Sequence, residues 1–284
     1  MHSMDNQGSP IRPEASGGHP NRVGVAVPPT PHTLPSSLLL HLGPGLVVGA
    51  AYLALVPAAR ALGLPSAAAV GSQALLVTGP LMIGILKVSS HRRPGEPTIA
   101  LRRVPTVAAT LGWATLMICA AAAAFVLTRP VAAWLERTVF WAWPDSWKPQ
   151  LGTAGGYSDS ALLWTAVLLL IGSVLIAPVV EEAYFRGYLL PRMPVRLGRP
   201  APVAHAVLFA LYHVWTLWLT PTRILAILPL IYITLRTRSV LPAMVAHVVL
   251  NLIDVVVIIV FIIRPGDKAS PQRHRPAGRC SGVK

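Results

Sequence analysis

The chain has 284 residues, of which 54% are hydrophobic and only 12% are charged. Soluble domains carry about a quarter charged residues, so this composition excludes an ordinary soluble domain and favours a membrane protein. A net charge of +14 would favour nucleic-acid binding in a soluble protein. Here the basic residues stand mainly in short loops between apolar runs, where they act as topology signals and contact lipid headgroups. We therefore expect membrane lipid, and no nucleic acid, as a partner.

The two ends of the chain lack apolar runs. Residues 1–33 are rich in proline, glycine and polar residues, and we expect a disordered N-terminal tail there. Residues 264–284 form a basic C-terminal tail. The two cysteines, Cys119 in an apolar run and Cys280 in that tail, indicate neither a disulfide framework nor a metal site.

Seven apolar runs lie between the tails. A bilayer core of about 30 Å needs about 20 residues of helix, which most of the runs supply, and only helices keep the backbone paired in lipid. We therefore predict an all-α fold, a polytopic transmembrane bundle of about seven helices, with six to eight compatible with the pattern. The sixth run is short and contains Pro229, so we expect a broken or partly re-entrant helix there. The runs are residues 37–58, 67–88, 106–127, 161–180, 201–219, 224–235 and 241–263.

Residues 128–160 form the longest polar interval and contain four tryptophans. Because tryptophan favours the headgroup level, this interval predicts an interfacial helix, and a loop packed on the bundle is an equal alternative.

Lysine and arginine concentrate in the loops on one side of the predicted bundle. They stand in 89–105, 186–200 and the loop at Arg236, whereas the opposing short loops offer only Arg60 and Arg223. The positive-inside rule places the basic loops and the N-terminus in the cytoplasm. Seven spans would put the basic C-terminal tail outside, so either the span count differs by one or the tail departs from the rule.

Three acidic residues, Glu181, Glu182 and Asp254, fall within or beside long apolar stretches. An ionisable side chain in a bilayer is costly, which makes it a candidate functional residue. On a helix, adjacent residues project about 100° apart. Glu182 and Arg186 are four residues apart in the order that favours an ion pair, which leaves Glu181 free. The alternative is that both acids neutralise arginines at the interface.

More polar residues lie in the later runs. His213 follows an apolar stretch in the fifth run, and His247 and Asn251 lie on one face of the last helix. In lipid each of these groups needs a polar partner, and another member of the set is the least costly one. A carboxylate can activate water as a general base, histidine can orient the water or bind a metal, and asparagine can stabilise an oxyanion. The chain contains neither a Gly-x-Ser-x-Gly nor a His-Glu-x-x-His motif.

Three motifs carry a family resemblance. Residues 181–186 (Glu-Glu-Ala-Tyr-Phe-Arg) resemble the EExxxR motif of the CAAX protease and bacteriocin-processing family, the CPBP or Abi family. Residues 209–213 resemble its FxxxH motif and residues 247–251 its HxxxN motif. All three stand in the family's order within residues 160–255, about a third of the chain.

The resemblance implies an intramembrane endopeptidase similar to CAAX prenyl endopeptidases. Its catalytic core would be residues 161–263, preceded by N-terminal transmembrane helices and an interfacial segment at 34–160, with the site toward the cytoplasmic side. Glu181 would be the general base, and His213, His247 and Asn251 would surround the water and stabilise the oxyanion. Glu182 completes the catalytic set and, with Arg186 and Phe209, would hold the geometry.

A metalloprotease mechanism is a second possibility within the family. Glu181, His213 and His247 supply the three ligands of a divalent metal site, for which zinc is the expected ion, and Glu182 would then be the more natural base. We expect a peptide or protein substrate and a bacterial plasma membrane. Two alternatives are a non-catalytic immunity or scaffold protein of the same fold, and a transporter with a carboxylate relay. The transporter predicts internal repeats, which the sequence does not show.

Three other polar residues carry less weight. We expect Asp254 to pair with a loop arginine or to line the bundle, although it lies near the face of His247. We expect His205 at the cytoplasmic interface and His41 to have no functional partner.

Overall fold

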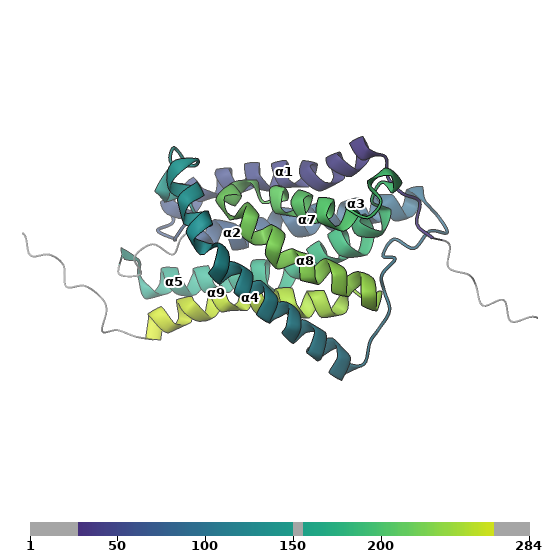
Figure 1. The fold of residues 1–284 in the computed structure, drawn as a ribbon. Helices are drawn as coiled ribbons and strands as arrows, with labels where there is room; N and C mark the ends of the chain where they lie inside the picture. The colour runs from purple at the N-terminus through teal and green to yellow at the C-terminus, as the bar shows by residue number, and fades with distance from the viewer. Residues whose placement is uncertain (1–27, 150–155, 264–284) are drawn as a thin grey trace, which may run out of the picture.

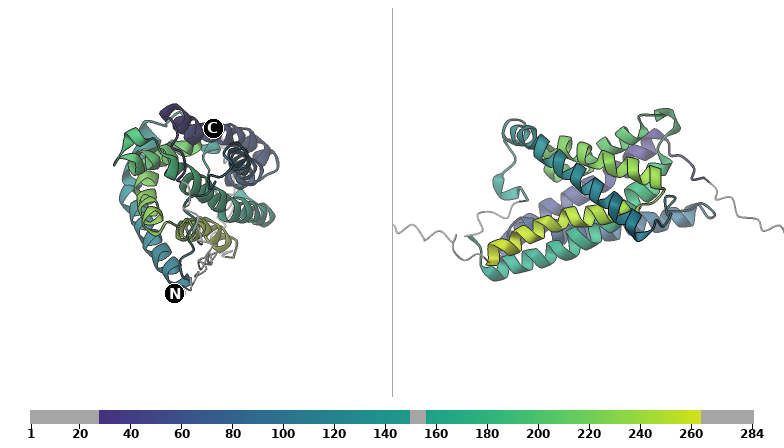
Figure 2. Two further views of the ribbon diagram at one scale, coloured as in Figure 1. Left: turned by 90° about the vertical axis from the view of Figure 1, so that its right-hand side faces the viewer. Right: turned by 60° about the horizontal axis from the view of Figure 1, so that its bottom comes forward.

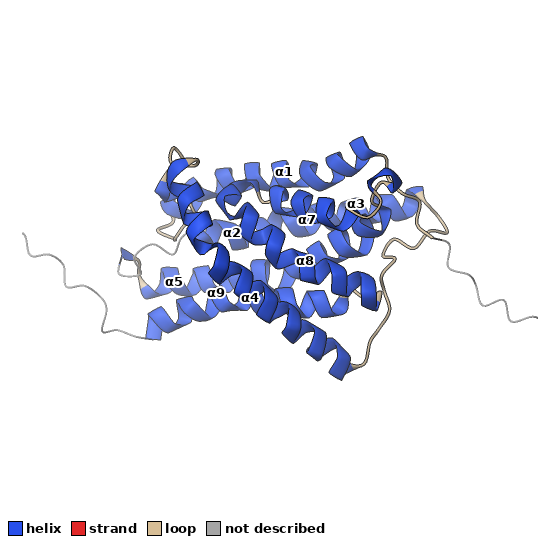
Figure 3. Cartoon of the chain, in the orientation of Figure 1, coloured by secondary structure: helices blue, strands red, loops and turns tan. Residues whose placement is uncertain are grey.

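The computed structural model describes residues 28–149 and 156–263, which form helices and loops without a β-strand (Figures 1 and 3). Within these residues five helical segments are long and apolar enough to cross a membrane, and two shorter apolar helices accompany them. The chain is therefore an integral membrane protein, and the predicted all-α bundle of about seven helices is confirmed. The long segments are Leu34–Ala61, Ala67–Arg92, Val107–Thr138, Asp159–Arg192 and Val214–Thr237, and the short ones are Ala201–Tyr212 and Leu241–Ile253.

Three of the long helices begin at a residue that caps the first turn. The side chain of Thr106 accepts a hydrogen bond from the Ala109 amide at 3.2 Å, and Ser158 does the same for Ala161 at 3.2 Å. Such caps satisfy amides that have no partner inside the helix. The α-helices are α1 (Leu34–Ala61), capped by Thr33, α2 (Ala67–Gln73), α3 (Gly79–Arg92), α4 (Val107–Thr138), α5 (Asp159–Leu168), α6 (Ala177–Glu181), α7 (Ala201–Tyr212), α8 (Thr220–Thr237) and α9 (Leu241–Ile263).

We call each long membrane-spanning segment a rod. The second rod (Ala67–Arg92) and the fourth rod (Asp159–Arg192) contain wider, π-helical turns. Between α2 and α3 lies η1 (Ala74–Thr78), and between α5 and α6 lies η4 (Leu169–Ile176). A third π-helical segment, η5 (Glu182–Leu189), follows α6 directly. Segments of this kind are rare and occur frequently at functional sites. Two of the three lie at the predicted glutamate pair, because η4 ends shortly before Glu181 and η5 begins at Glu182.

The predicted helix boundaries between residues 201 and 237 were wrong. The expected run 201–219 is α-helical only as far as Tyr212, because the backbone leaves the helical region at His213 (φ −82°, ψ 58°). A 3₁₀ segment, η8 (Val214–Leu219), then leads into α8. The broken helix expected at Pro229 is instead the continuous α8. In a membrane bundle, neighbouring helices allow a proline inside a helix to be tolerated.

The polar interval 128–160 is shorter than predicted because α4 continues to Thr138. Trp134 therefore lies on α4, and 55% of it is exposed. Further on, the carbonyl of Trp147 accepts a hydrogen bond from the Tyr52 hydroxyl at 2.7 Å. For the described part of the interval, this contact favours the loop packed on the bundle; residues 150–155 lie outside the described part.

The 186–200 stretch was also only partly a loop. The fourth rod continues through the 3₁₀ turn η6 (Leu190–Arg192), and Arg186 and Arg192 are 0% and 1% exposed. Arg192 donates hydrogen bonds to the carbonyls of Pro97 at 2.7 Å and Tyr188 at 3.0 Å. Both arginines are buried inside the bundle, so they do not contribute to a loop topology signal.

The helices run along one common direction, and α4 crosses the others obliquely over α8 and α9 (Figures 1 and 2). The described chain begins α1 at one end of the bundle and ends α9 at the other (Figure 1). This arrangement agrees with an odd number of passes. The predicted N-terminal tail (apart from 28–33) and the basic C-terminal tail lie outside the described residues.

Close contacts at glycine bring α1 against the end of α7. A Cβ atom added to Gly45 would overlap the Tyr212 carbonyl, and one added to Gly49 would overlap the Val214 side chain. The break at His213 is thus packed directly on the backbone of α1.

We therefore expect Gly45→Ala to destabilise the bundle by about 1–3 kcal/mol, because a methyl group there meets backbone that cannot move aside. The loss would be measured as a lower melting temperature of the purified protein in detergent. Gly112→Ala on α4, where an added Cβ meets nothing within 4 Å, is the matched control and should not lower it. Equal melting of the two variants would contradict the contact.

Candidate active site

The glutamate pair lies inside the fourth rod, where α6 meets η5. Glu181 is the last residue of α6 and Glu182 the first of η5, and the rod continues to Arg192. The helix therefore continues well beyond the apolar run at 161–180. Both acids are inside the protein, with Glu181 5% exposed and Glu182 0% exposed.

Glu182 forms the predicted ion pair with Arg186. Its Oε1 atom lies 3.2 Å from Arg186 Nη1 and 2.9 Å from His247 Nδ1. Both Glu182 and Arg186 are fully buried. One carboxylate oxygen thus joins η5 to α9, and the charge of the acid is balanced inside the protein.

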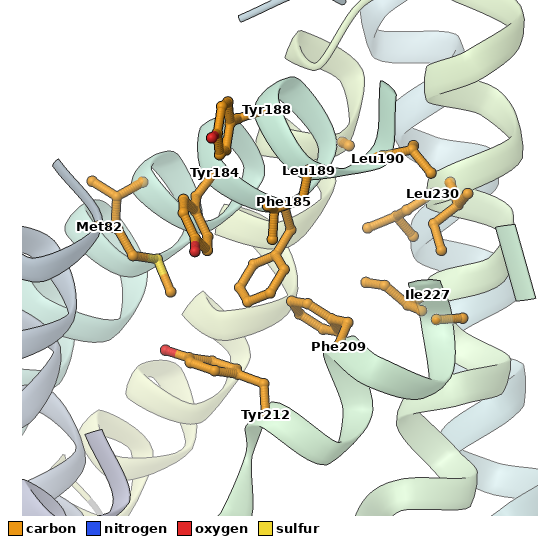
Figure 4. Close-up of a cluster of buried hydrophobic side chains, with 14 of the residues drawn as sticks. Met82, Tyr184, Phe185, Tyr188, Leu189, Leu190, Phe209, Tyr212, Ile227 and Leu230 are labelled. Carbon is orange, nitrogen blue, oxygen red and sulfur yellow. The ribbon is translucent and has the colours of Figure 1, made fainter. Parts of the chain in front are cut away.

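Arg186 is held from its other side by an aromatic ring. The guanidinium carbon lies 4.0 Å from the centre of the Phe209 ring, which also packs edge-to-face on Phe185 at 4.9 Å. Figure 4 shows Phe185, Phe209 and Tyr212 facing one another in the buried cluster. A cation over a buried aromatic face is stabilised by the ring electrons. Phe209 therefore contacts the cation that balances Glu182.

Glu181 has a different environment from its neighbour. The Tyr212 hydroxyl is its hydrogen-bond donor, 3.4 Å from Oε1. Glu181 lines a cavity of about 570 Å³, and Glu182 does not. The predicted division of the pair therefore agrees with the geometry, since one acid faces a cavity and the other is held by Arg186 and His247.

His213 lies at the break between α7 and η8 and also lines the cavity. Its Nδ1 atom is 3.1 Å from the Phe209 carbonyl oxygen. Because a carbonyl oxygen only accepts, Nδ1 carries the hydrogen, and the Nε2 atom of the neutral ring keeps its lone pair. The helix break thus fixes the tautomer of this histidine.

His247 and Asn251 enter the cavity from α9, on the shared face that their spacing predicted. The Asn251 side-chain amide donates a hydrogen bond to the Ser173 carbonyl at 2.7 Å. Ser173 lies in η4, where the π-helical turns interrupt the regular backbone pairing and make such a carbonyl available. The amide of Asn251 has a second hydrogen left for another acceptor.

The cavity therefore brings together Glu181, His213, His247 and Asn251, whereas Glu182, Arg186 and Phe209 form the adjacent packed layer, with Phe209 also at the cavity wall. Arg223 was not predicted as a site residue: it was expected in a loop, but it lies in the first turn of α8 and lines the same cavity. Arg223 directly precedes the apolar run 224–235, and this adjacency could have indicated that the arginine belongs to the helix and not to a loop. Tyr212 was also missed, because a hydroxyl in an apolar run is too common to stand out, and Ser173 was missed because it contributes a backbone carbonyl, which the residue type does not reveal.

The three predicted metal ligands line the same cavity but are not placed to share one metal ion. In residues 28–149 and 156–263 no three side chains of His, Cys, Asp or Glu are arranged to hold a metal ion. His247 Nδ1 is instead bound to Glu182. The donor set of Glu181, His213 and His247 thus does not fit a three-ligand metal site in this arrangement.

Two histidines outside the cavity differ from expectation. His205 is fully buried instead of lying at an interface, and its Nδ1 atom lies 2.9 Å from His41 Nε2. His41 therefore has a partner, and its own Nδ1 donates to the Ser37 carbonyl at 2.7 Å. The side chain of Asp254 lies outside the described part of the structure.

Comparison with known proteins agrees with the three motifs. Residues 163–253 match the family model described as type II CAAX prenyl endopeptidase Rce1-like. The matched stretch contains the EExxxR, FxxxH and HxxxN motifs, so the resemblance to the CPBP family is confirmed over this part of the chain. No curated protein and no solved structure matches the chain. At the family level the match supports a membrane protease of the CAAX-protease type.

We expect Arg186→Met to destabilise the protein by about 3–5 kcal/mol, because it leaves the buried Glu182 carboxylate without its cation. Thermal unfolding in detergent would measure the loss. Arg196→Met changes an exposed arginine and serves as the matched control.

A variant that removes both charges shows whether the lost stability comes from the unpaired charge of Glu182 or from the lost packing of Arg186. The double variant Glu182→Gln, Arg186→Met should recover much of the stability lost in Arg186→Met alone. Additive losses in the double variant would show that the pair does not act as a unit.

Proposed function

We propose that this protein is an intramembrane endopeptidase, similar to CAAX prenyl endopeptidases, that hydrolyses a peptide bond by glutamate-activated water. The observation that carries the proposal is the division of the glutamate pair. Glu181 faces a cavity together with His213, His247 and Asn251, while Glu182 is occupied by Arg186 and His247. A general base must reach the cavity in which the substrate lies, and Glu181 meets this requirement.

In the proposed reaction, Glu181 removes one proton from a water molecule while the Nε2 lone pair of His213 accepts the hydrogen bond of the other. The water oxygen attacks the carbonyl carbon of the scissile bond, and the carbonyl oxygen becomes an oxyanion. The free amide hydrogen of Asn251 donates to that oxyanion, and His247 supports it from the same face of α9. Glu181 then gives the proton to the leaving amine, and the peptide bond breaks.

The layer behind the cavity has a positioning role in this proposal. Glu182 orients the His247 ring through Nδ1, which directs the opposite ring nitrogen away from the acid. Arg186 and Phe209 hold Glu182 in turn. We assign the site to the cytoplasmic side of the membrane because the basic loops contact one another at one end of the bundle, through Arg192 with Pro97 and Arg102 with Ser239. A bacterial plasma membrane is part of the same proposal.

We expect Glu181→Gln to lower the rate of hydrolysis by about 10²- to 10⁴-fold without lowering the melting temperature, because the amide cannot accept the proton of water. The measurement is cleavage of a fluorogenic peptide with an S-farnesyl cysteine by the purified protein in detergent. Asp145→Asn, whose side chain is 86% exposed, is the matched control and should cleave at the wild-type rate.

The same variant separates the enzyme from a non-catalytic immunity or scaffold protein of this fold. A scaffold would retain its cellular phenotype in well-expressed Glu181→Gln protein, and that result would overturn the peptidase proposal.

We expect hydrolysis to persist after dialysis against a chelator, because the candidate ligands do not converge on a metal site in the described residues. Metal analysis of the purified protein would be measured alongside the rate. One zinc ion per chain, together with loss of cleavage on chelation and its return on adding zinc, would contradict the metal-independent reaction.

A further inference from the structure

Arg223 is a cavity residue that the proposed reaction does not use. It lines the cavity together with Glu181 and His213. In the described residues no carboxylate forms an ion pair with its guanidinium. The Glu181 carboxylate acts on Arg223 through space without forming an ion pair with it. A cation in an apolar setting without an ion-paired anion is costly, so its retention there points to an anion that arrives with a ligand.

Two hydrogen bonds to one residue fix the orientation of the Arg223 guanidinium. Its Nη1 atom donates to the Thr216 carbonyl at 3.0 Å, and its Nη2 atom donates to the Thr216 hydroxyl at 2.8 Å. Thr216 has a non-helical backbone inside η8 (φ −147°, ψ 49°), which presents both acceptors to the same arginine. A guanidinium has five N–H donors, so these two bonds leave three for another partner.

The local backbone also favours an anion near Arg223. Arg223 lies in the first turn of α8, where no side chain caps the helix. The Thr220 hydroxyl in that turn is buried and has no hydrogen-bond partner. The amino-terminal end of a helix carries a partial positive charge, which adds to that of the arginine.

We propose that Arg223 binds a carboxylate of the peptide substrate and so fixes the position of the peptide relative to Glu181. This inference rests on the proposed function for the identity of the ligand as a peptide. The planar guanidinium matches a carboxylate, which accepts two parallel N–H bonds. The carboxylate can be the free C-terminus of the peptide or the side chain of an acidic residue, and the two sources are separated by the probes below.

The size and polarity of the cavity agree with a short peptide end. Its volume is about 570 Å³, and most of its wall is apolar, with alanines and Phe125 from α4 and Leu250 from α9. A cavity of this size holds a short segment and not a folded domain. In the described part of its wall, Arg223 is the only lysine or arginine.

The test measures binding in a background that does not cleave. Glu181→Gln protein in detergent is titrated with a fluorescent peptide that carries an S-farnesyl cysteine followed by three apolar residues. The peptide is made as the free acid, as the C-terminal amide, and as the amide with one aspartate in the apolar stretch. We expect the free acid to bind about 10- to 100-fold more tightly than the plain amide.

The variant Arg223→Met should remove this preference, and Arg223→Lys, which keeps a point charge, should retain part of it. Arg236→Met, an exposed arginine on the same helix, is the matched control and should leave the preference unchanged. Melting temperatures of all variants show whether they are folded. Tighter binding of the aspartate amide than of the free acid would support the carboxylate site and assign the side chain as the source.

Equal binding of the free acid, the plain amide and the aspartate amide, or no binding of any of the three, would overturn the proposal. A role of Arg223 in balancing the charge of Glu181 alone predicts a different result, because Arg223→Met in the otherwise wild-type protein would then lower kcat for acid and amide alike. Loss of the carboxylate contact instead raises KM for the acid. If the acid is preferred but never cleaved, the binding site stands and the peptidase proposal fails.

Discussion

The carboxylate of Glu182 is the constraint around which the site is built. A buried charge in a membrane bundle must be balanced inside the protein, and here Arg186 and His247 share one oxygen of the acid. These contacts tie η5 to α9 and place the Arg186 guanidinium on the Phe209 ring of α7. Three segments from distant parts of the sequence are therefore held in one relative position. Because Glu182 is occupied in this way, its neighbour Glu181 is the acid that remains for the cavity.

Backbone that departs from the regular α-helix orients two further side chains of the site, Asn251 and His213. The π-helical η4 offers the Ser173 carbonyl to Asn251, and the break after Tyr212 places the His213 ring against the Phe209 carbonyl. A regular helix would use both carbonyls for its own pairing. Asn251 and His213, two of the side chains used in the proposed reaction, are thus oriented by bonds to backbone groups, which do not change rotamer.

The helical class, the apolar runs and the motif residues could be predicted from the sequence because hydropathy and spacing are local properties. The Glu182–Arg186 pair could be predicted for the same reason. The bond between Glu182 and His247, the end of α7 at Tyr212 and the position of Arg223 could not, because each depends on how distant helices pack. The composition of the last runs likewise could not show that Pro229 lies inside a continuous helix, since the packing around it decides that outcome.

The contacts of α1 bear on where the functional unit of this chain begins. The family match covers residues 163–253, yet Gly45 and Gly49 touch the segment at Tyr212 and Val214 on either side of His213. The Tyr184 hydroxyl, within the EExxxR motif, donates to the Leu40 carbonyl of α1 at 2.7 Å. The first helix is thus one wall of the scaffold that sets the geometry of the candidate site. The recognisable motif region is not a detachable module, and swapping it between relatives would require that α1 travel with it.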